Sequence, residues 1–158
     1  MHAARICGIA QDNILLGLAT FSGVKGRLEK QVLPHGVSCY VDYAHTPDSY
    51  TQVLSLLRSM TDHLTVVFGC GGLRDKSKRP IMGNIAAAIA DSVILTSDNP
   101  RMEDPLEIIA QIKHGVALQD VHKIIEISDR AQAIGYACAQ APKNGIVAIL
   151  GKGPDEYQ

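Results

Sequence analysis

Residues 92–105, SVILTSDNPRMEDP, join a short apolar run to a polar turn. An apolar run of this length, bounded by turn residues, is typical of a buried strand. In open α/β sheets the ligand lies at the carboxyl ends of the strands, so the polar residues after this run indicate a binding site. The alternative is a simple turn, because Asn and Asp bond their own backbone and Pro restricts φ. Both interpretations are open from this stretch alone.

The same alternation of apolar runs and helical patterns continues on either side of this stretch. Strands are predicted at residues 39–42, 64–69, 92–96, 123–127 and 146–150, and helices at 47–60, 78–90, 105–115 and 129–141. Thr46 and Pro47 are a typical N-cap and first residue for the first of these helices. Short apolar strands joined through helices favour a parallel sheet covered on both faces. We therefore predict an α/β fold with a doubly wound, mostly parallel sheet.

The first 30 residues do not fit this alternation. Two short helices are predicted at residues 3–8 and 11–20, and the glycine-containing segment 21–27 then breaks the helical pattern. Two such helices cannot bury an apolar face by themselves. We predict that residues 1–30 are the tail of a preceding domain with its linker, and that residues 31–158 form the α/β domain.

Composition excludes several classes of function. The 158 residues carry a formal net charge of -1, which gives no electrostatic basis for binding nucleic acid or an anionic membrane. No apolar run is long enough to span a bilayer, and the four cysteines are far apart with no metal-binding spacing. We expect a cytoplasmic protein with free cysteines and no bound metal.

The predicted loop at residues 42–47, DYAHTP, contains groups suited to a nucleotide. Asp42 can bond a ribose diol, Tyr43 is an adjacent aromatic ring, and His45 precedes a helix N-terminus. The alternative is a capping loop with a surface histidine.

The predicted loop at residues 69–80, GCGGLRDKSKRP, has the character of an anion site. Its glycines let backbone N–H groups approach an anion, and Arg74, Lys76, Lys78 and Arg79 add positive charge. It does not match the dinucleotide fingerprint, because Arg74 stands where that motif needs glycine. A flexible basic loop is the alternative.

Residues 151–158, GKGPDEYQ, follow the last predicted strand and add a fourth loop to the same edge of the sheet. They do not form a phosphate-binding P-loop, because Gly153 occupies the position of Ser or Thr. No nucleophile elbow, zinc-protease motif or Cys–His pair occurs in the chain. The residues thus predict a binding rim for an anionic or zwitterionic small molecule, and they predict no catalytic set.

Several of these motifs, in this order and spacing, resemble the C-terminal domain of the Mur ligases. They are DYAHTPD at 42–48, FGCGG at 68–72, RDK at 74–76, KRP at 78–80, DNPR at 98–101 and GKG at 151–153. The resemblance covers residues 21–158. It implies a Rossmann-like domain from a three-domain, ATP-dependent ligase of peptidoglycan synthesis, in which an acyl phosphate of the substrate is attacked by the amine of an incoming amino acid.

The resemblance to members that add meso-diaminopimelate to UDP-MurNAc-L-Ala-D-Glu also implies roles for individual residues. The diaminopimelate site would comprise Arg74, Asp98, Asn99, Pro100, Arg101, Gly151 and Asp155. The ATP contacts would be Arg27, Asp42, Tyr43 and His45. ATP and Mg²⁺ would act in the intact enzyme, with none bound to this fragment alone, and catalysis would consist of positioning and charge neutralisation. The resemblance implies a cytoplasmic bacterial monomer that is inactive without its P-loop domain.

The last loop departs from the family pattern. The family reads Gly-Lys-Gly-His-Glu, whereas Pro154 and Asp155 follow Gly153 here. Asp is one methylene shorter than Glu, and Pro stiffens the loop and removes a donor. A ligase domain that takes lysine and a non-catalytic binding module are therefore both kept as alternatives.

Overall fold

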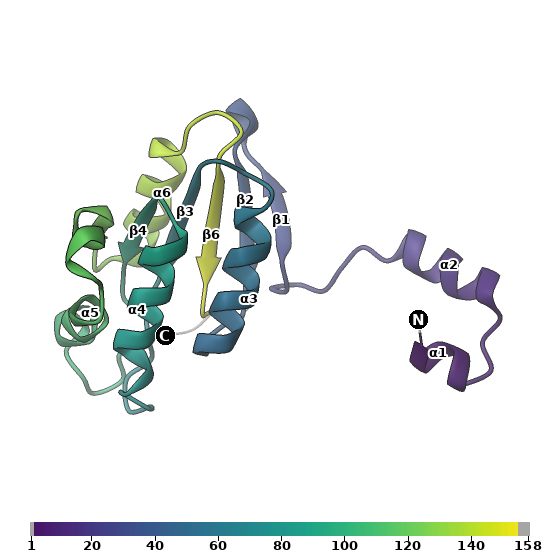
Figure 1. Ribbon diagram of the computed structural model, residues 1–158, viewed down its shortest axis with the longest axis horizontal. Helices are drawn as coiled ribbons and strands as arrows, with labels where there is room; N and C mark the ends of the chain where they lie inside the picture. The colour runs from purple at the N-terminus through teal and green to yellow at the C-terminus, as the bar shows by residue number, and fades with distance from the viewer. Residues whose placement is uncertain (1, 155–158) are drawn as a thin grey trace.

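The computed structural model describes residues 2–154, which form a six-stranded sheet with helices on both faces (Figure 1). The strand order is β1-β2-β6-β3-β4-β5, and only β1 at one edge is antiparallel to its neighbour. The strands are β1 (Glu29–Val32), β2 (Ser38–Asp42), β3 (Leu64–Phe68), β4 (Ser92–Leu95), β5 (Ile124–Glu126) and β6 (Ile146–Leu150). The predicted fold class, a doubly wound and mostly parallel sheet, is confirmed.

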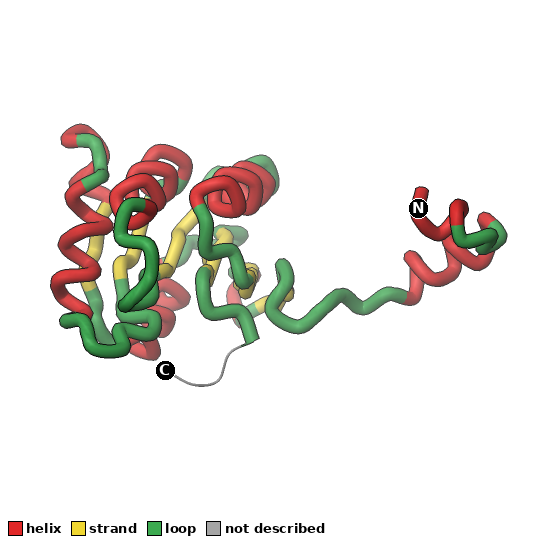
Figure 2. Tube along the Cα trace, turned by 90° about the horizontal axis from the view of Figure 1, so that it is seen from below, coloured by secondary structure: helices red, strands yellow, loops and turns green. Residues whose placement is uncertain are grey.

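Four helices connect the parallel strands and cover the sheet unequally. Helices α3 (Pro47–Arg58), α4 (Lys78–Ile89) and α5 (Pro105–His114) pack on one face, and α6 (Arg130–Gln140) packs on the other. Figure 2 shows helices on both sides of the strands. A parallel sheet needs such cover because neither of its faces can be left to water.

Side chains of the central strands alternate between the two faces. Val66 and Phe68 of β3 face the helices α3, α4 and α5, whereas Val67 faces α6. All three are fully buried. This period of two accounts for the continuous apolar runs in the sequence, since both faces of each central strand are covered.

The N-terminal helices α1 (His2–Ile6) and α2 (Gln11–Thr20) lie apart from the sheet, at the end of an extended segment (Figure 1). Ile14 is their one buried residue among those that the structure describes, and Leu15, Leu16 and Leu18 of α2 are exposed. The two predicted helices are therefore present, with α1 ending before the predicted residue 8. No helix in residues 2–154 has the length and apolarity needed to cross a bilayer.

Two elements lie outside the predicted pattern. Strand β1 has the polar sequence EKQV and begins at Glu29, so the sheet includes two residues that we assigned to the preceding segment. The predicted strand at 123–127 is shorter, because a 3-10 helix, Leu118–Lys123, occupies its first residue. An exposed edge strand needs few apolar residues, which explains why hydrophobic patterning did not find β1.

Candidate functional site

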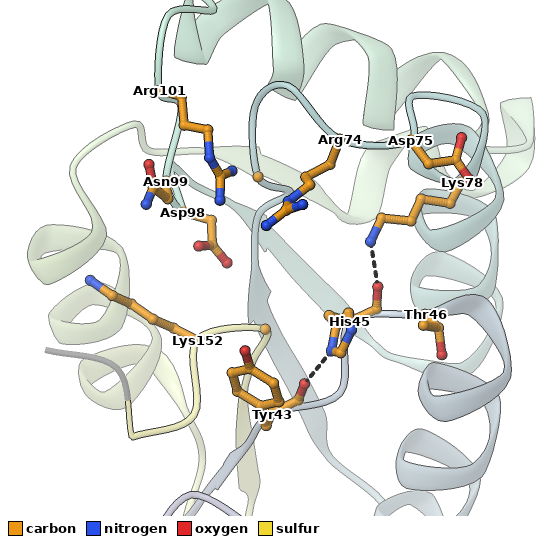
Figure 3. Close-up of a pocket in the computed structure, with 12 residues that line it drawn as sticks. Tyr43, His45, Thr46, Arg74, Asp75, Lys78, Asp98, Asn99, Arg101 and Lys152 are labelled. Atoms are coloured by element: carbon orange, nitrogen blue, oxygen red, sulfur yellow. Dashed lines mark hydrogen bonds between the residues drawn. The ribbon is translucent and has the colours of Figure 1, made fainter. Parts of the chain in front are cut away.

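Four loops leave the carboxyl ends of the parallel strands on the same side of the sheet. We call them loop 1 (43–46, after β2), loop 2 (69–77, after β3), loop 3 (96–104, after β4) and loop 4 (151–154, after β6). They surround a cavity of about 600 Å³ (Figure 3). The cavity is lined by Tyr43, His45, Thr46, Gly71, Arg74, Asp75, Lys78, Asp98, Asn99, Arg101, Gly151 and Lys152. The rim predicted from the sequence is thus a single cavity.

Loops 2 and 3 are joined directly by their backbones. The amide of Gly72 donates to the carbonyl of Asn99 at 2.8 Å, and Arg101 Nη1 donates to the carbonyl of Gly72 at 2.6 Å. The approach requires glycine, because a Cβ on Gly72 would lie 1.9 Å from the carbonyl oxygen of Pro100. From the sequence we considered a simple turn and a binding site as alternatives for this stretch. In the structure the DNPR motif forms a turn that also lines the cavity.

Two guanidinium groups and a carboxylate face the cavity from these loops. Figure 3 shows Arg74 and Arg101 pointing into the cavity toward one another, with Asp98 below them. Arg101 has a left-handed backbone, φ 53°, directly after Pro100. The cavity therefore presents cations for a carboxylate together with an acceptor suited to an ammonium group.

Only two of the four cations predicted for the basic loop line this cavity, Arg74 and Lys78. Arg79 is 0% exposed and forms an ion pair with Glu103, which also pairs with Lys76 at 3.0 Å. The expectation that Lys76 and Arg79 supply charge to the anion site is therefore wrong. Sequence position did not reveal this, because the pairing partner lies 24 residues further along the chain.

Loop 1 contributes an aromatic ring and an oriented imidazole. The Tyr43 ring lies 4.9 Å from the guanidinium carbon of Arg27 and 5.2 Å from the His45 ring. His45 Nδ1 is 2.9 Å from the carbonyl oxygen of Tyr43, so Nδ1 carries the proton and donates. Lys78 Nζ donates to the carbonyl of His45 at 2.7 Å, which links α4 to loop 1.

Asp42 is 7% exposed and does not line the cavity. Its Oδ1 accepts from the amide of Ala44 at 2.7 Å, and its Oδ2 accepts from the amide of Leu28 at 2.8 Å. Arg27 and Pro100 also lie outside the cavity lining, and Asp155 lies outside the described residues. The predicted contact of Asp42 with a nucleotide therefore stays a prediction. In the structure its carboxylate holds the backbone amides of Leu28 and Ala44.

Beneath the cavity, Arg130 connects loop 3 to the end of β6. It is 8% exposed, and its Nη2 donates to the carbonyl of Leu150 at 3.0 Å, with Nη1 3.5 Å from the carbonyl of Ser97. Burial lowers the pKa of this guanidinium, and the nearby Asp98 carboxylate acts in the opposite direction. We did not identify Arg130 from the sequence, where it appears only as the second residue of the predicted helix at 129–141.

Local contacts set the charge states around the cavity. Hydrogen bonds from Arg79, Leu73 and Lys76, in that order, lower the pKa of Glu103 from 4.5 to about 2. The Ser77 hydroxyl lowers the pKa of the Asp75 carboxyl. Burial raises the pKa of the Cys70 thiol from 9.0 to about 11, so this thiol stays protonated at neutral pH.

Within the described part of the chain, no group of three His, Cys, Asp or Glu side chains could hold a metal ion. We therefore assign no magnesium ligands among residues 2–154.

The chain is similar to known proteins in both sequence and fold. Residues 26–153 match the family model described as Mur ligase, glutamate ligase domain. A curated relative, UDP-N-acetylmuramoyl-L-alanyl-D-glutamate--2,6-diaminopimelate ligase of Bacteroides thetaiotaomicron, is 43% identical over 159 residues, covering 99% of this chain and 33% of the relative. The chain spans about a third of the length of the curated relatives that it matches.

Two solved structures are similar to the fold described above. One is a UDP-N-acetylmuramoyl-L-alanyl-D-glutamate--2,6-diaminopimelate ligase, 42% identical with a TM-score of 0.78, which covers 99% of this chain and 32% of that one. The other is a Mycobacterium tuberculosis folylpolyglutamate synthase complexed with ADP, 19% identical with a TM-score of 0.71, which covers 90% of this chain and 33% of that one. At 19% identity the second likeness concerns the fold alone.

Proposed function

The chain belongs to the Mur ligase family, and from this premise we propose that it is the amino-acid-binding C-terminal domain of a ligase that adds meso-diaminopimelate to UDP-MurNAc-L-Ala-D-Glu. The observation that carries the proposal is the placement of Arg74 and Arg101 in one cavity with Asp98. Diaminopimelate has an ammonium and a carboxylate at each end. A site for its distal end needs a cation that can bind a carboxylate with two hydrogen bonds and an acceptor for the ammonium group.

The contribution of this chain to the reaction would be positioning. In the intact enzyme, ATP would activate the substrate carboxyl as an acyl phosphate. Arg74 and Arg101 would hold the distal carboxylate, with Asp98 and Asn99 beside the ammonium group, so that the other amine faces the activated carbonyl. Holding the two reactants in this geometry lowers the entropic part of the barrier. Gly151, which lines the cavity, and Asp155, which lies outside the described residues, would belong to the same diaminopimelate site.

We assign the nucleotide contacts to loop 1 and the linker. Arg27 stacks on Tyr43, and Tyr43 lines the cavity with His45, so a phosphate near Arg27 would lie next to the aromatic wall. Asp42 supports this region through its bonds to Leu28 and Ala44. We place the enzyme in the bacterial cytoplasm as a monomer, and we expect the fragment alone to be inactive because the P-loop lies in another domain.

Calorimetric titration of the full-length ligase with meso-diaminopimelate and with L-lysine tests the substrate. We expect preferential binding of diaminopimelate, and Arg101→Ala should weaken it by about 1.5–3 kcal/mol, the value of a hydrogen bond to a charged group. Lysine has no distal carboxylate, so its affinity should not change. Arg58→Ala, which removes a surface ion pair with Asp91, is the matched control.

Equal or tighter binding of lysine would overturn the diaminopimelate assignment in favour of a lysine-adding ligase. Absence of ATP turnover with either amino acid in the full-length protein would favour a non-catalytic binding module.

A further inference from the structure

Arg79 is one of the largest fully buried side chains among the described residues, yet it does not line the cavity. It lies in the first turn of α4 and is 0% exposed. A buried guanidinium is costly unless it is paired and its donors are satisfied. The hydrogen-bond partners of Arg79 therefore indicate the role of its buried guanidinium group.

Glu103 of loop 3 binds Arg79 through both carboxylate oxygens. Arg79 Nη1 lies 2.9 Å from Oε2, and Nη2 lies 3.1 Å from Oε1. This two-point geometry restricts both distance and orientation. Arg79 also donates to Gln111 Oε1 at 2.6 Å and to the carbonyl of Gly71 in loop 2 at 3.1 Å. One arginine thus connects α4, α5, loop 2 and loop 3.

The Glu103 carboxylate is shared with loop 2. Its Oε1 accepts from the amide of Leu73 at 2.5 Å, and its Oε2 pairs with Lys76 at 3.0 Å. The Glu103 side chain is only 10% exposed. Because Glu103 belongs to loop 3 and both of these contacts come from loop 2, Glu103 joins the two loops.

The two arginines that face the cavity are attached to the residues held in this way. Arg74 follows Leu73 directly, and Arg101 precedes Glu103 by two residues. Arg101 also depends on the spacing of the loops, because its Nη1 donates to the carbonyl of Gly72.

We propose that the Arg79–Glu103 pair is a positioning device that sets Arg74 and Arg101 at the separation needed to bind one carboxylate of the incoming amino acid. The inference rests on the proposed function for the identity of that amino acid. Both residues act through the loops, since neither lines the cavity. Glu103 lies in loop 3, outside the strands of the sheet.

The test compares Glu103→Gln with Asp91→Asn in the full-length ligase. Asp91 is a matched control that directly precedes β4, at the amino end of the strand and therefore at the opposite end from the cavity loops. Its carboxylate also accepts from an arginine, Arg58 at 2.5 Å, and from a backbone amide, that of Leu64 at 2.8 Å. In Glu103→Gln the new NH₂ group faces donors of Arg79, Lys76 or Leu73, so the two loops separate. Asp91→Asn makes the same change of charge away from the cavity.

We expect Glu103→Gln to raise the KM for the amino acid about 10- to 100-fold, as a displacement of about 1 Å would. The KM for ATP and for the UDP-linked substrate should stay within about twofold of wild type. Hydrogen exchange of the Gly72 amide should become faster. Asp91→Asn should leave all three KM values unchanged.

If Glu103→Gln does not fold, Glu103→Asp takes its place, because it keeps the charge beside Arg79 but cannot reach all its partners, and the same pattern with smaller changes is expected. Unchanged exchange at Gly72 overturns the inference, and so does faster exchange with an unchanged KM for the amino acid. If the wild-type protein turns over ATP with no amino acid, the proposed function fails. The Gly72 exchange in Glu103→Gln then decides alone whether the pair positions the loops.

Discussion

Loops 2 and 3 close one side of the cavity through backbone hydrogen bonds and a buried ion pair, whereas loops 1 and 4 close the other side mainly through a ring packed on a glycine. A Cβ on Gly153 would lie 2.7 Å from Cδ2 of the Tyr43 ring, and Gly151 donates its amide to the carbonyl of Asp42 at 3.1 Å. The first side is thus held together by groups of the sheet domain itself. The second includes no ion pair among the contacts described above.

The linker supplies the remaining contacts of the second side. Leu28 donates its amide to Asp42, Arg27 stacks on Tyr43, and a Cβ on Gly26 would lie 2.4 Å from Pro154 Cδ. These linker residues lead to the extended segment that carries α2 (Figure 1). The side built from loops 2 and 3 is therefore preformed, while the position of the side built from loops 1 and 4 depends on the linker.

The largest loss of stability is expected at the close contact between loops 2 and 3. Gly72→Ala should destabilise the domain by about 4 kcal/mol, because its Cβ would meet the backbone oxygen of Pro100 and loops 2 and 3 would have to separate. Denaturant unfolding measures the change. Gly17→Ala in α2 is the control, since nothing lies within 4 Å of its added Cβ, and it should cost no stability. Equal stability of the two variants would contradict the preformed contact.

On the second side, Asp42→Ala should cost about 2–3 kcal/mol, because it leaves the amides of Leu28 and Ala44 without their acceptor. Exchange of these two amides should accelerate, and exchange at Gly72 should not. Asp129→Ala removes the acceptor of a single exposed amide, that of Gln132, and should cost about 1 kcal/mol. If Asp42→Ala also loosens Gly72, the two sides are not independent.

The sheet and the convergence of its loops could be predicted because both follow from local patterns. Continuous apolar runs such as residues 64–68 mark strands covered on both faces, and parallel strands direct their loops to one edge. Strand β1 was missed because EKQV carries no apolar alternation, and its pairing with β2 depends on the chain reversal at residues 34–36.

The roles of individual charges were less predictable. Asp42 ends one apolar strand and Asp98 follows another, but only Asp98 lines the cavity. The Asp42 carboxylate instead accepts from the amide of Leu28, 14 residues earlier in the chain. Arg74 and Arg79 both belong to the basic loop, yet Arg79 is turned toward Glu103 and Gln111. Whether a charged side chain lines the cavity or is buried in an internal contact depends on partners that are distant in the sequence. The periodicity of apolar residues carries no information about these partners.

Protonation of Glu103 should weaken the contact between loops 2 and 3, and only at low pH. The Glu103 carboxyl has a pKa of about 2 in the folded chain and an ordinary value of 4.5, so folding favours its ionised form. Its contribution to stability is therefore fully present above pH 4.5 and is lost progressively as the pH falls toward 2. Thermal unfolding between pH 5 and pH 2 should show a smaller acid-induced decrease in Glu103→Gln than in the wild type. Parallel decreases in the two proteins would contradict the assignment.

The smallest effect is expected from backbone strain within loop 2. Leu73 has φ 52°, the left-handed region, although it is neither glycine nor asparagine. This conformation costs an L residue about 1–2 kcal/mol, and Asn tolerates it better because its short polar side chain bonds locally. The Leu73 side chain is 58% exposed, so its removal loses little apolar burial.

Leu73→Asn should therefore stabilise the domain by about 0.5–1 kcal/mol, part of the cost of the left-handed conformation. The backbone amide that donates to Glu103 is kept in this variant, so the gain should appear as slower exchange in loop 2, with no change at Ala44 on the other side of the cavity. Leu118→Asn is the control, since Leu118 is 92% exposed without a positive φ, and its stability should change by less than about 0.5 kcal/mol. An equal gain in both variants would mean that replacing an exposed leucine by asparagine stabilises the protein for a reason other than relief of strain beside Glu103.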